Sequence, residues 1–108
     1  MPQKIVTKKE DISNVINYIN DIKKKSINMD SLRGGNTSWI QTYDEDDYMI
    51  DSIMFQGKYL DLNGQMYKIN EIENERMMDL YDFLDYSETN WEENCLDVLN
   101  YQKPYKRK

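Results

Sequence analysis

Carboxylates are the side chains of this sequence whose number and spacing could do chemistry. Residues 44–97 hold sixteen Asp and Glu against three Lys and Arg, a net charge of −13, and the segment opens with four consecutive acidic residues at 44–47. Such side chains can ligate a divalent cation, exchange protons in pairs, or attract a positively charged partner. The neighbouring residues decide between these three kinds of chemistry.

The residues around the carboxylates do not favour metal binding or catalysis. The acidic run lacks the glycine at the sixth position and the distal Glu of an EF-hand loop. The chain contains no His, which leaves no histidine metal ligand and no histidine-based nucleophile. Its one cysteine, Cys95, falls on an apolar stripe among carboxylates, where a thiol is not activated. We therefore expect no catalytic residue, no metal ion and no cofactor, and we predict that the protein is not an enzyme.

Tyrosine and tryptophan are interleaved with the carboxylates, and this favours a binding surface. Aromatic residues are enriched at protein interfaces, where they bury a large area. Carboxylates on a rigid support can also imitate the phosphates of a nucleic acid. We therefore predict a surface that binds a macromolecular partner. Its candidate residues, all acidic or aromatic, are Asp44, Glu45, Asp46, Asp47, Tyr48, Tyr59, Asp79, Asp82, Asp85, Glu88, Trp91, Glu92 and Glu93.

The first element that the sequence predicts is a helix over residues 8–25. Isoleucine and valine recur at spacings of three and four between Ile12 and Ile22. Thr7 and Glu10 have the spacing of a capping box at the start of this helix. The lysines at 23–25 suit the negative end of the helix dipole, so we expect the helix to end there.

A three-stranded antiparallel meander is predicted next. Asn63-Gly64 is typical of a two-residue hairpin turn, and Gln56-Gly57 is a second turn candidate. Residues 39–43 are an optional fourth strand at the edge. The alternation of side chains then gives one apolar and one mixed face. The apolar face is predicted to hold Ile53, Phe55, Leu60, Leu62, Tyr67 and Ile69.

Two C-terminal helices complete the predicted fold. The first begins near Asn70 or Asn74 and buries a stripe that includes Met77 and Leu80. The second follows a capping box at Thr89 and ends before Pro104. The fold class is therefore α+β, with an N-terminal helix, a three-stranded antiparallel meander and two C-terminal helices. We expect a single domain over residues 1–108, with a basic flexible tail at 102–108.

The predicted element order and the acidic segments ENERMMDLYDFL and NWEENCLDVL resemble some small phage-encoded type II anti-CRISPR inhibitors. The resemblance covers most of the chain and rests on element order and acidic composition, without a signature motif. Inhibitors of this kind occupy the site on their target nuclease that binds the protospacer-adjacent motif of DNA. The resemblance therefore implies a protein that blocks a nucleic-acid site on a host enzyme.

Two functions are consistent with these observations. The first is an inhibitor from a phage or mobile element that occupies a basic nucleic-acid-binding groove of a host protein by mimicry. The alternative is a non-mimic protein-binding module, such as an immunity protein, an antitoxin-like partner or a phage regulator of host machinery. Direct nucleic-acid binding through Lys23–Lys25 and the basic tail is a third possibility, and the net charge of −6 argues against it. The lone cysteine and the absence of a long apolar run lead us to expect the host cytoplasm and no membrane.

Overall fold

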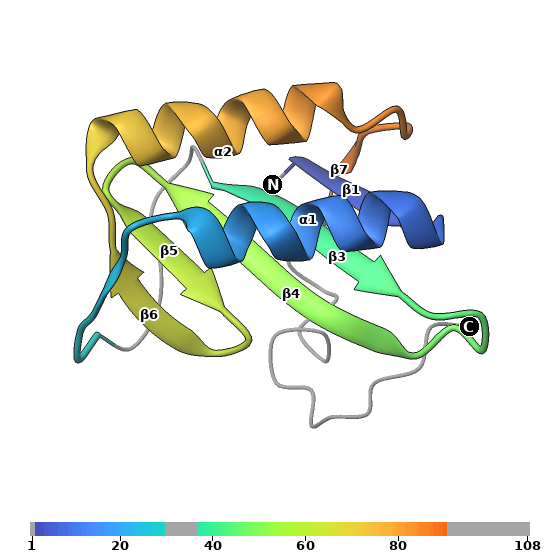
Figure 1. Cartoon of the computed structure of the whole chain (residues 1–108), viewed down its shortest axis with the longest axis horizontal. Coiled ribbons are helices and arrows are strands. Elements are labelled where there is room, and N and C mark those ends of the chain that lie inside the picture. Colours follow the sequence, from blue (N-terminus) through green and yellow to red (C-terminus); the bar gives the residue numbers. More distant parts are fainter. Residues whose placement is uncertain (1, 30–36, 91–108) are drawn as a thin grey trace.

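The fold is a mixed β-sheet with both helices on one face (Figure 1). The computed structural model describes residues 2–29 and 37–90. Within them seven strands form one sheet, in the spatial order β2-β6-β5-β4-β3-β1-β7. Neither of the two described helices is long and apolar enough to cross a membrane. In chain order the elements are β1 (Pro2–Val6), α1 (Lys9–Asp21), β2 (Lys25–Ser26), β3 (Ser38–Tyr43), β4 (Met49–Gln56), β5 (Tyr59–Leu62), β6 (Gln65–Lys68), α2 (Glu71–Phe83) and β7 (Thr89–Asn90).

The strand β3 is central to the sheet and is buried along its whole length. It pairs in parallel with β1 on one side and antiparallel with β4 on the other. The chain then continues through antiparallel pairs from β4 to β5 and β6. Two-residue strands lie at the edges, with β2 beside β6 and β7 beside β1. Parallel neighbours need a crossover connection, and the connection from β1 to β3 includes α1.

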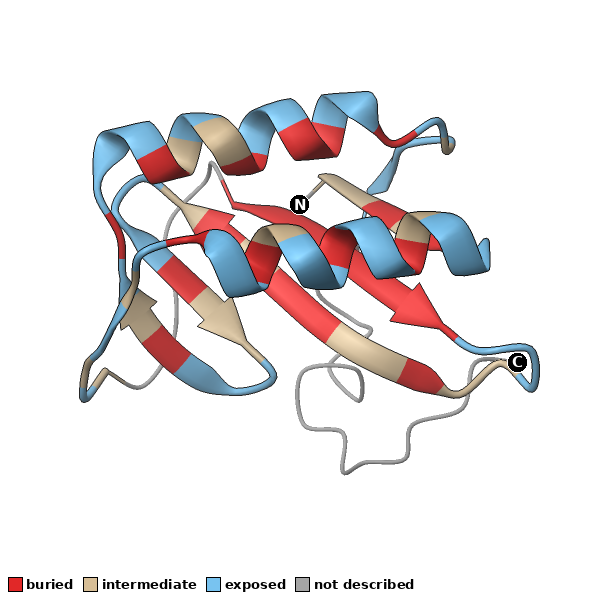
Figure 2. Ribbon diagram, viewed as in Figure 1, coloured by how far each residue is buried: buried red, intermediate tan, exposed pale blue. Residues whose placement is uncertain are grey.

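Apolar side chains of both helices and of the central strands form one core between the helices and the sheet (Figure 2). Burial of these side chains is the main favourable term in folding. On the other face of the sheet Trp39, Tyr43 and Met66 are also buried. The buried members of the core are Val6, Ile12, Val15, Ile19, Ile22, Ile40, Ile53, Phe55, Leu60, Ile69, Met77, Leu80, Tyr81 and Leu84.

A lysine of β1 ties the C-terminal end of α2 to the sheet. Lys4 Nζ donates hydrogen bonds to the carbonyl oxygens of Tyr81 at 2.7 Å and Leu84 at 2.9 Å. The ammonium also lies 4.6 Å from the centre of the Tyr81 ring. Helix ends leave carbonyl groups unpaired, and a cation suits the negative end of the helix dipole. Lys4 is therefore a buried charge whose hydrogen bonds are satisfied by the helix end.

A backbone N–H group at the N-terminal end of α1 is hydrogen-bonded to a residue that lies far away in the sequence. The predicted capping box is wrong, because Lys8 occupies the cap position and makes no side-chain capping bond. The hydroxyl of Tyr86 instead accepts a hydrogen bond from the Lys8 N–H at 3.1 Å and donates to the Asp11 carboxylate at 2.7 Å. Burial and the bond to Asp11 raise the pKa of Tyr86. A residue that follows α2 thus makes a side-chain hydrogen bond at the start of α1, where the sequence predicted one from Thr7.

The predicted fold, an N-terminal helix followed by a three-stranded antiparallel meander and two C-terminal helices, is wrong in element order and strand order. A strand, β1, precedes the helix, and residues 39–43 belong to a central strand instead of an edge strand. Polar side chains that the fold buries concealed the strand β1 and the central position of β3, Lys4 in the first case and Gln41 in the second. Gln41 donates to Gln3 Oε1 at 2.6 Å, so its burial leaves the amide nitrogen paired.

The helix boundaries agree with the sequence only in part. The predicted helix 8–25 ends at Asp21, and Lys25 belongs to β2. The predicted start of α2 is confirmed, because the side chain of Asn70 accepts from the Glu73 N–H at 2.8 Å. Thr89 belongs to β7 and pairs with Gln3 of β1. The rest of the predicted last helix and the tail at 102–108 lie outside the described residues.

The hairpin signals gave the correct faces and one correct register. Asn63 and Gly64 have φ of 53° and 90°, as a type I′ turn requires, and Leu60 lies opposite Tyr67 as predicted. The turn before β5 lies one residue later than predicted, so Phe55 pairs with Leu60. This changes the register between β4 and β5 by two residues. Side chains alternate with a period of two, so each stays on its predicted face.

Candidate partner-binding surfaces

Four of the predicted acidic residues lie in the turn between β3 and β4, at the right-hand end of Figure 1. Asp44 Oδ1 accepts hydrogen bonds from the backbone N–H groups of Asp46 and Tyr48, both at 2.9 Å. The backbone N–H of Asp47 donates to the Asp44 carbonyl oxygen at 3.1 Å, and Asp47 has a φ of 65°. These bonds fix the turn. Asp44, Glu45 and Asp46 are exposed on it.

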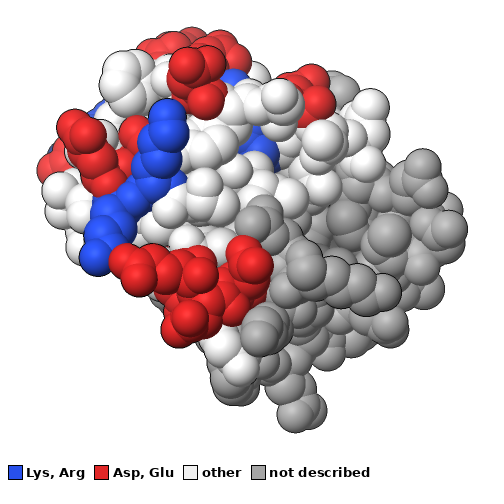
Figure 3. Space-filling view, turned by 90° about the vertical axis from the view of Figure 1, so that its right-hand side faces the viewer, with Lys and Arg blue, Asp and Glu red and all other residues white. Residues whose placement is uncertain are grey.

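The end of the molecule that carries this turn is not uniformly acidic. Lys9, at the start of α1, places its Nζ 3.0 Å from Glu45 Oε1. Figure 3 views this end, and basic side chains lie between the acidic group at its lower centre and the acidic groups above. We define residues 44–48 as the acidic turn, and basic side chains lie beside it at this end of the molecule.

The other predicted carboxylates follow α2 and the segment after it. Asp79 and Asp82 are exposed on α2, and Asp85 and Glu88 come after its end. Glu88 accepts a hydrogen bond from the Tyr81 hydroxyl at 2.8 Å. Burial and this bond raise the pKa of Tyr81. The described part of the chain does not include the three remaining candidates, Trp91, Glu92 and Glu93.

Tyr59 lies far from the acidic turn. It is directly opposite Gln56, the last residue of β4, whereas the acidic turn precedes Met49, the first residue of that strand. On its other side Tyr59 is directly opposite Lys68 of β6. The structure therefore does not unite the thirteen predicted residues in one surface, and it places Tyr59 beside a lysine.

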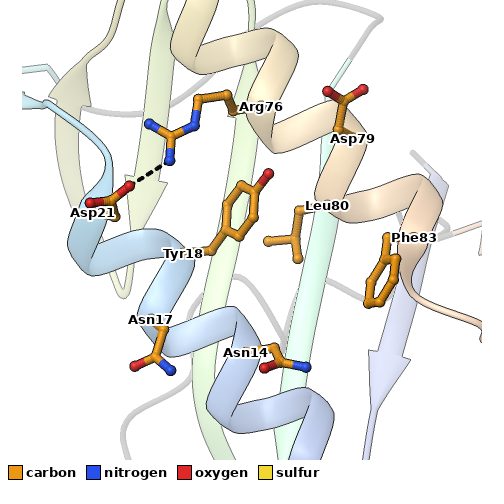
Figure 4. Close-up of a pocket in the computed structure, with 8 residues that line it drawn as sticks. All are labelled: Asn14, Asn17, Tyr18, Asp21, Arg76, Asp79, Leu80 and Phe83. Atoms are coloured by element: carbon orange, nitrogen blue, oxygen red, sulfur yellow. Dashed lines mark hydrogen bonds and ion pairs between the residues drawn. The ribbon is translucent and has the colours of Figure 1, made fainter.

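A groove that the sequence did not predict runs between the two helices (Figure 4). Its volume is about 710 Å³, within the range of protein binding pockets. Each helix contributes residues at positions i, i+3 or i+4, and i+7, which lie on one helix face. The lining residues are Asn14, Asn17, Tyr18 and Asp21 of α1 and Arg76, Asp79, Leu80 and Phe83 of α2.

One end of the groove is closed by an ion-pair network. Arg76 Nη2 lies 2.6 Å from Asp21 Oδ2, and Arg76 Nη1 lies 3.2 Å from Glu73 Oε2. The hydrogen bond to Asp21 raises the pKa of Arg76. The guanidinium also lies 5.5 Å from the centre of the Tyr18 ring. The one cation that lines the groove is therefore fully engaged with residues of the protein itself.

The middle and the other end of the groove combine apolar surface with unpaired polar groups. Phe83 is 70% exposed, and Leu80 lies between the two helices beside it. Among the described residues, the Asp79 carboxylate has neither an ion pair nor a hydrogen bond, and the same holds for the amide side chains of Asn14 and Asn17. Phe83 stands outside the buried stripe of α2, and this was the one sequence signal that could have indicated the groove.

Comparison with known proteins found no match. No family model matches the chain, and no curated protein or solved structure does so. The likeness to anti-CRISPR inhibitors was based on element order and acidic composition, and the structure does not have the predicted element order. The described residues include no group of three or more His, Cys, Asp or Glu side chains that could hold a metal ion. The function has to be inferred from the surfaces themselves.

Proposed function

We propose that this protein is a non-catalytic binding module whose interhelical groove holds a segment of another protein. The observation that carries the proposal is the pairing of an exposed apolar ring, Phe83, with an unpaired carboxylate, Asp79, on one wall of the groove. Buried aromatic anchors and fully desolvated charges supply most of the affinity at protein interfaces.

The chemistry of the groove favours a partner segment with one Lys or Arg next to an apolar side chain. The apolar side chain would pack on Phe83 and Leu80, and the cation would pair with Asp79. Arg76 does not compete for Asp79, since its guanidinium already pairs with Asp21 and Glu73. These three contacts come from α2, and Asn14 and Asn17 of α1 line the facing wall of the groove.

The experiment is capture of the partner by the tagged full-length chain, followed by quantitative comparison of variants. Phe83→Ala and Asp79→Asn are expected to reduce the captured protein by about tenfold or more, as interface anchors do. Ile72→Ala is the matched control, because Ile72 is 66% exposed on the same helix but does not line the groove. Equal yields for Phe83→Ala and Ile72→Ala would refute the assignment of the groove.

The acidic turn supports a second candidate function, inhibition of a host nucleic-acid-processing protein by mimicry. Its hydrogen bonds hold consecutive carboxylates on a fixed backbone, as an imitation of phosphates requires. In this case the chain would be a phage or mobile-element inhibitor that acts in the host cytoplasm. The captured protein would then be displaced by DNA and released between roughly 0.1 and 1 M salt, where the Debye length falls from about 10 to about 3 Å.

The two candidates respond to opposite variants. Loss of capture on Glu45→Gln with Asp46→Asn, but not on Phe83→Ala, would support the mimic. Loss on Phe83→Ala, with capture that persists at high salt, would support the groove.

A further inference from the structure

We propose that one end of the sheet face opposite the helices binds single-stranded nucleic acid through a row of side chains that crosses four strands. The row consists of Gln56 on β4, Tyr59 on β5, Lys68 on β6 and Lys25 on β2, each directly opposite the next. Directly opposed residues of neighbouring strands lie on the same face of a sheet. Gln56, Tyr59 and Lys68 each precede or follow a residue that packs in the core, so they point away from the helices. Lys25 shares their face because it lies directly opposite Lys68.

The two lysines of the row are in an unfavourable arrangement unless an anion lies between them. Lys25 and Lys68 are exposed and directly opposite, which places their Cβ atoms about 5 Å apart. Like charges at such positions destabilise a sheet. Neither lysine has an ion pair with any residue that the structure describes. A phosphate between the two ammonium groups would convert their repulsion into two attractive contacts.

Two further lysines extend this basic surface. Lys68 lines two hollows, one shared with Lys23 and Lys25 and the other with Lys58. These residues come from the end of α1, the edge strand β2, the turn before β5 and the end of β6. Neither Lys23 nor Lys58 has an ion pair among the described residues. The fold thus gathers four cations from segments that are separate in the sequence.

The tyrosine in the row favours nucleic acid over other anions. Tyr59 is 36% exposed and lies directly beside Lys68. An aromatic ring on a sheet face next to cations is the arrangement on which proteins stack the bases of single strands while lysines contact the backbone. An acidic protein segment would use the lysines but gain little from the ring.

The net charge of −6 is less of an obstacle than the sequence suggested, because the densest acidic run lies away from this surface, although Asp61 shares its face and Glu71 lines one of its hollows. The acidic turn and Tyr59 lie at opposite ends of the eight residues of β4, about 25 Å apart. The Debye length at physiological ionic strength is about 8 Å, so the acidic turn is screened from a ligand on the basic surface.

The test is fluorescence anisotropy of a labelled oligothymidylate of roughly ten nucleotides with the full-length chain at low salt. We expect saturable binding that weakens as salt increases. Lys25→Ala with Lys68→Ala should weaken binding about tenfold or more and reduce the salt slope by about 1.4. Tyr59→Ala should also weaken binding, whereas Tyr59→Phe should retain it because the ring remains.

The matched control is Lys8→Ala with Lys9→Ala, which removes the same charge from exposed lysines beside the acidic turn. This pair should leave the affinity within about twofold. An equal loss in the control, or no saturable binding of the wild-type chain, would overturn the proposal. Displacement of the oligonucleotide by polyglutamate at equal charge concentration would also overturn it, in favour of an acidic protein ligand.

Circular dichroism spectra and thermal melts of each variant verify the fold. Phe83→Ala should not alter this binding, so the test is independent of the proposed groove.

Discussion

Charged side chains make different contacts at the two ends of β4. At the start of β4 the acidic turn is tied together by Asp44, which accepts two backbone hydrogen bonds, and Glu45 pairs with Lys9. Beyond the end of β4, Lys25 and Lys68 face each other without a described counter-ion. At the acidic end, part of the charge is therefore engaged in contacts within the protein. At the basic end, the two lysines have no ion pair with a described residue.

This difference shows that a run of like charges in a sequence need not become a surface of unpaired charges. The four residues at 44–47 are the densest acidic run in the chain, yet one of them shapes the turn and another has an internal partner. The lysines of the basic surface are scattered in the sequence and become a surface only through strand pairing. Four experiments test this contrast.

The largest effect is expected from Asp44→Ala. The substitution removes the acceptor of the N–H groups of Asp46 and Tyr48, and we expect it to lower the free energy of unfolding by about 1–2 kcal/mol. Asp44→Asn is the control, because it keeps the accepting oxygen and removes only the charge. Chemical denaturation measures both variants. A similar loss for Asn and Ala would mean that charge, and not hydrogen bonding, holds the acidic turn.

Lys25→Glu should change stability in the opposite direction at the other end. The substitution replaces a like-charged cross-strand pair with an opposite pair to Lys68, so the free energy of unfolding should rise by about 0.5–1 kcal/mol. The gain should shrink at high salt. Lys23→Glu is the control, because it changes charge equally without facing a strand neighbour. If Lys23→Glu stabilises the protein as much, the effect is one of net charge and the direct opposition of Lys25 and Lys68 is irrelevant.

The parts of the fold that the sequence predicted are those set by local interactions. The stripes of both helices, the Asn70 cap and the Asn63-Gly64 turn are each encoded within a few residues. The edge strands β2 and β7 have two residues each, too few to show an alternation. The pattern of β1 was hidden because Lys4 points into the protein toward the end of α2. These elements depend on tertiary contacts.

The candidate surfaces were less predictable than the fold for the same reason. The groove exists because Asp21 and Arg76, fifty-five positions apart, come within 2.6 Å when the two helices lie on one sheet face. Tyr59 was correctly noted as an exposed aromatic residue, but its neighbour Lys68 follows from the β5–β6 register. Composition indicated binding, and the location of the surfaces required the strand order.

Asp61→Asn tests a carboxylate on the face of the basic row and should have a smaller effect than Lys25→Glu. Burial raises the pKa of Asp61, and a hydrogen bond from the Gly64 N–H at 2.9 Å opposes this shift. A raised pKa means that stability is greatest below the ordinary carboxyl pKa and declines as the pH rises through the folded-state value. Asparagine keeps the acceptor and stays neutral. The advantage of the variant, measured by urea denaturation from about pH 3 to 7, should therefore grow with pH. An advantage independent of pH would exclude burial of the charge as its cause.

The smallest effect is expected from breaking the ion pair between Lys9 and Glu45. Both side chains are largely exposed, 85% and 77%, so solvent screens their attraction and side-chain ordering offsets most of the gain. A double-mutant cycle with Lys9→Ala and Glu45→Gln should give a coupling energy below about 0.5 kcal/mol, which falls further with salt. A coupling above about 1 kcal/mol would show that Lys9 helps to organise the acidic turn. In that case a partner that binds Glu45 would have to break its ion pair with Lys9. A ligand of the basic surface would break no described ion pair.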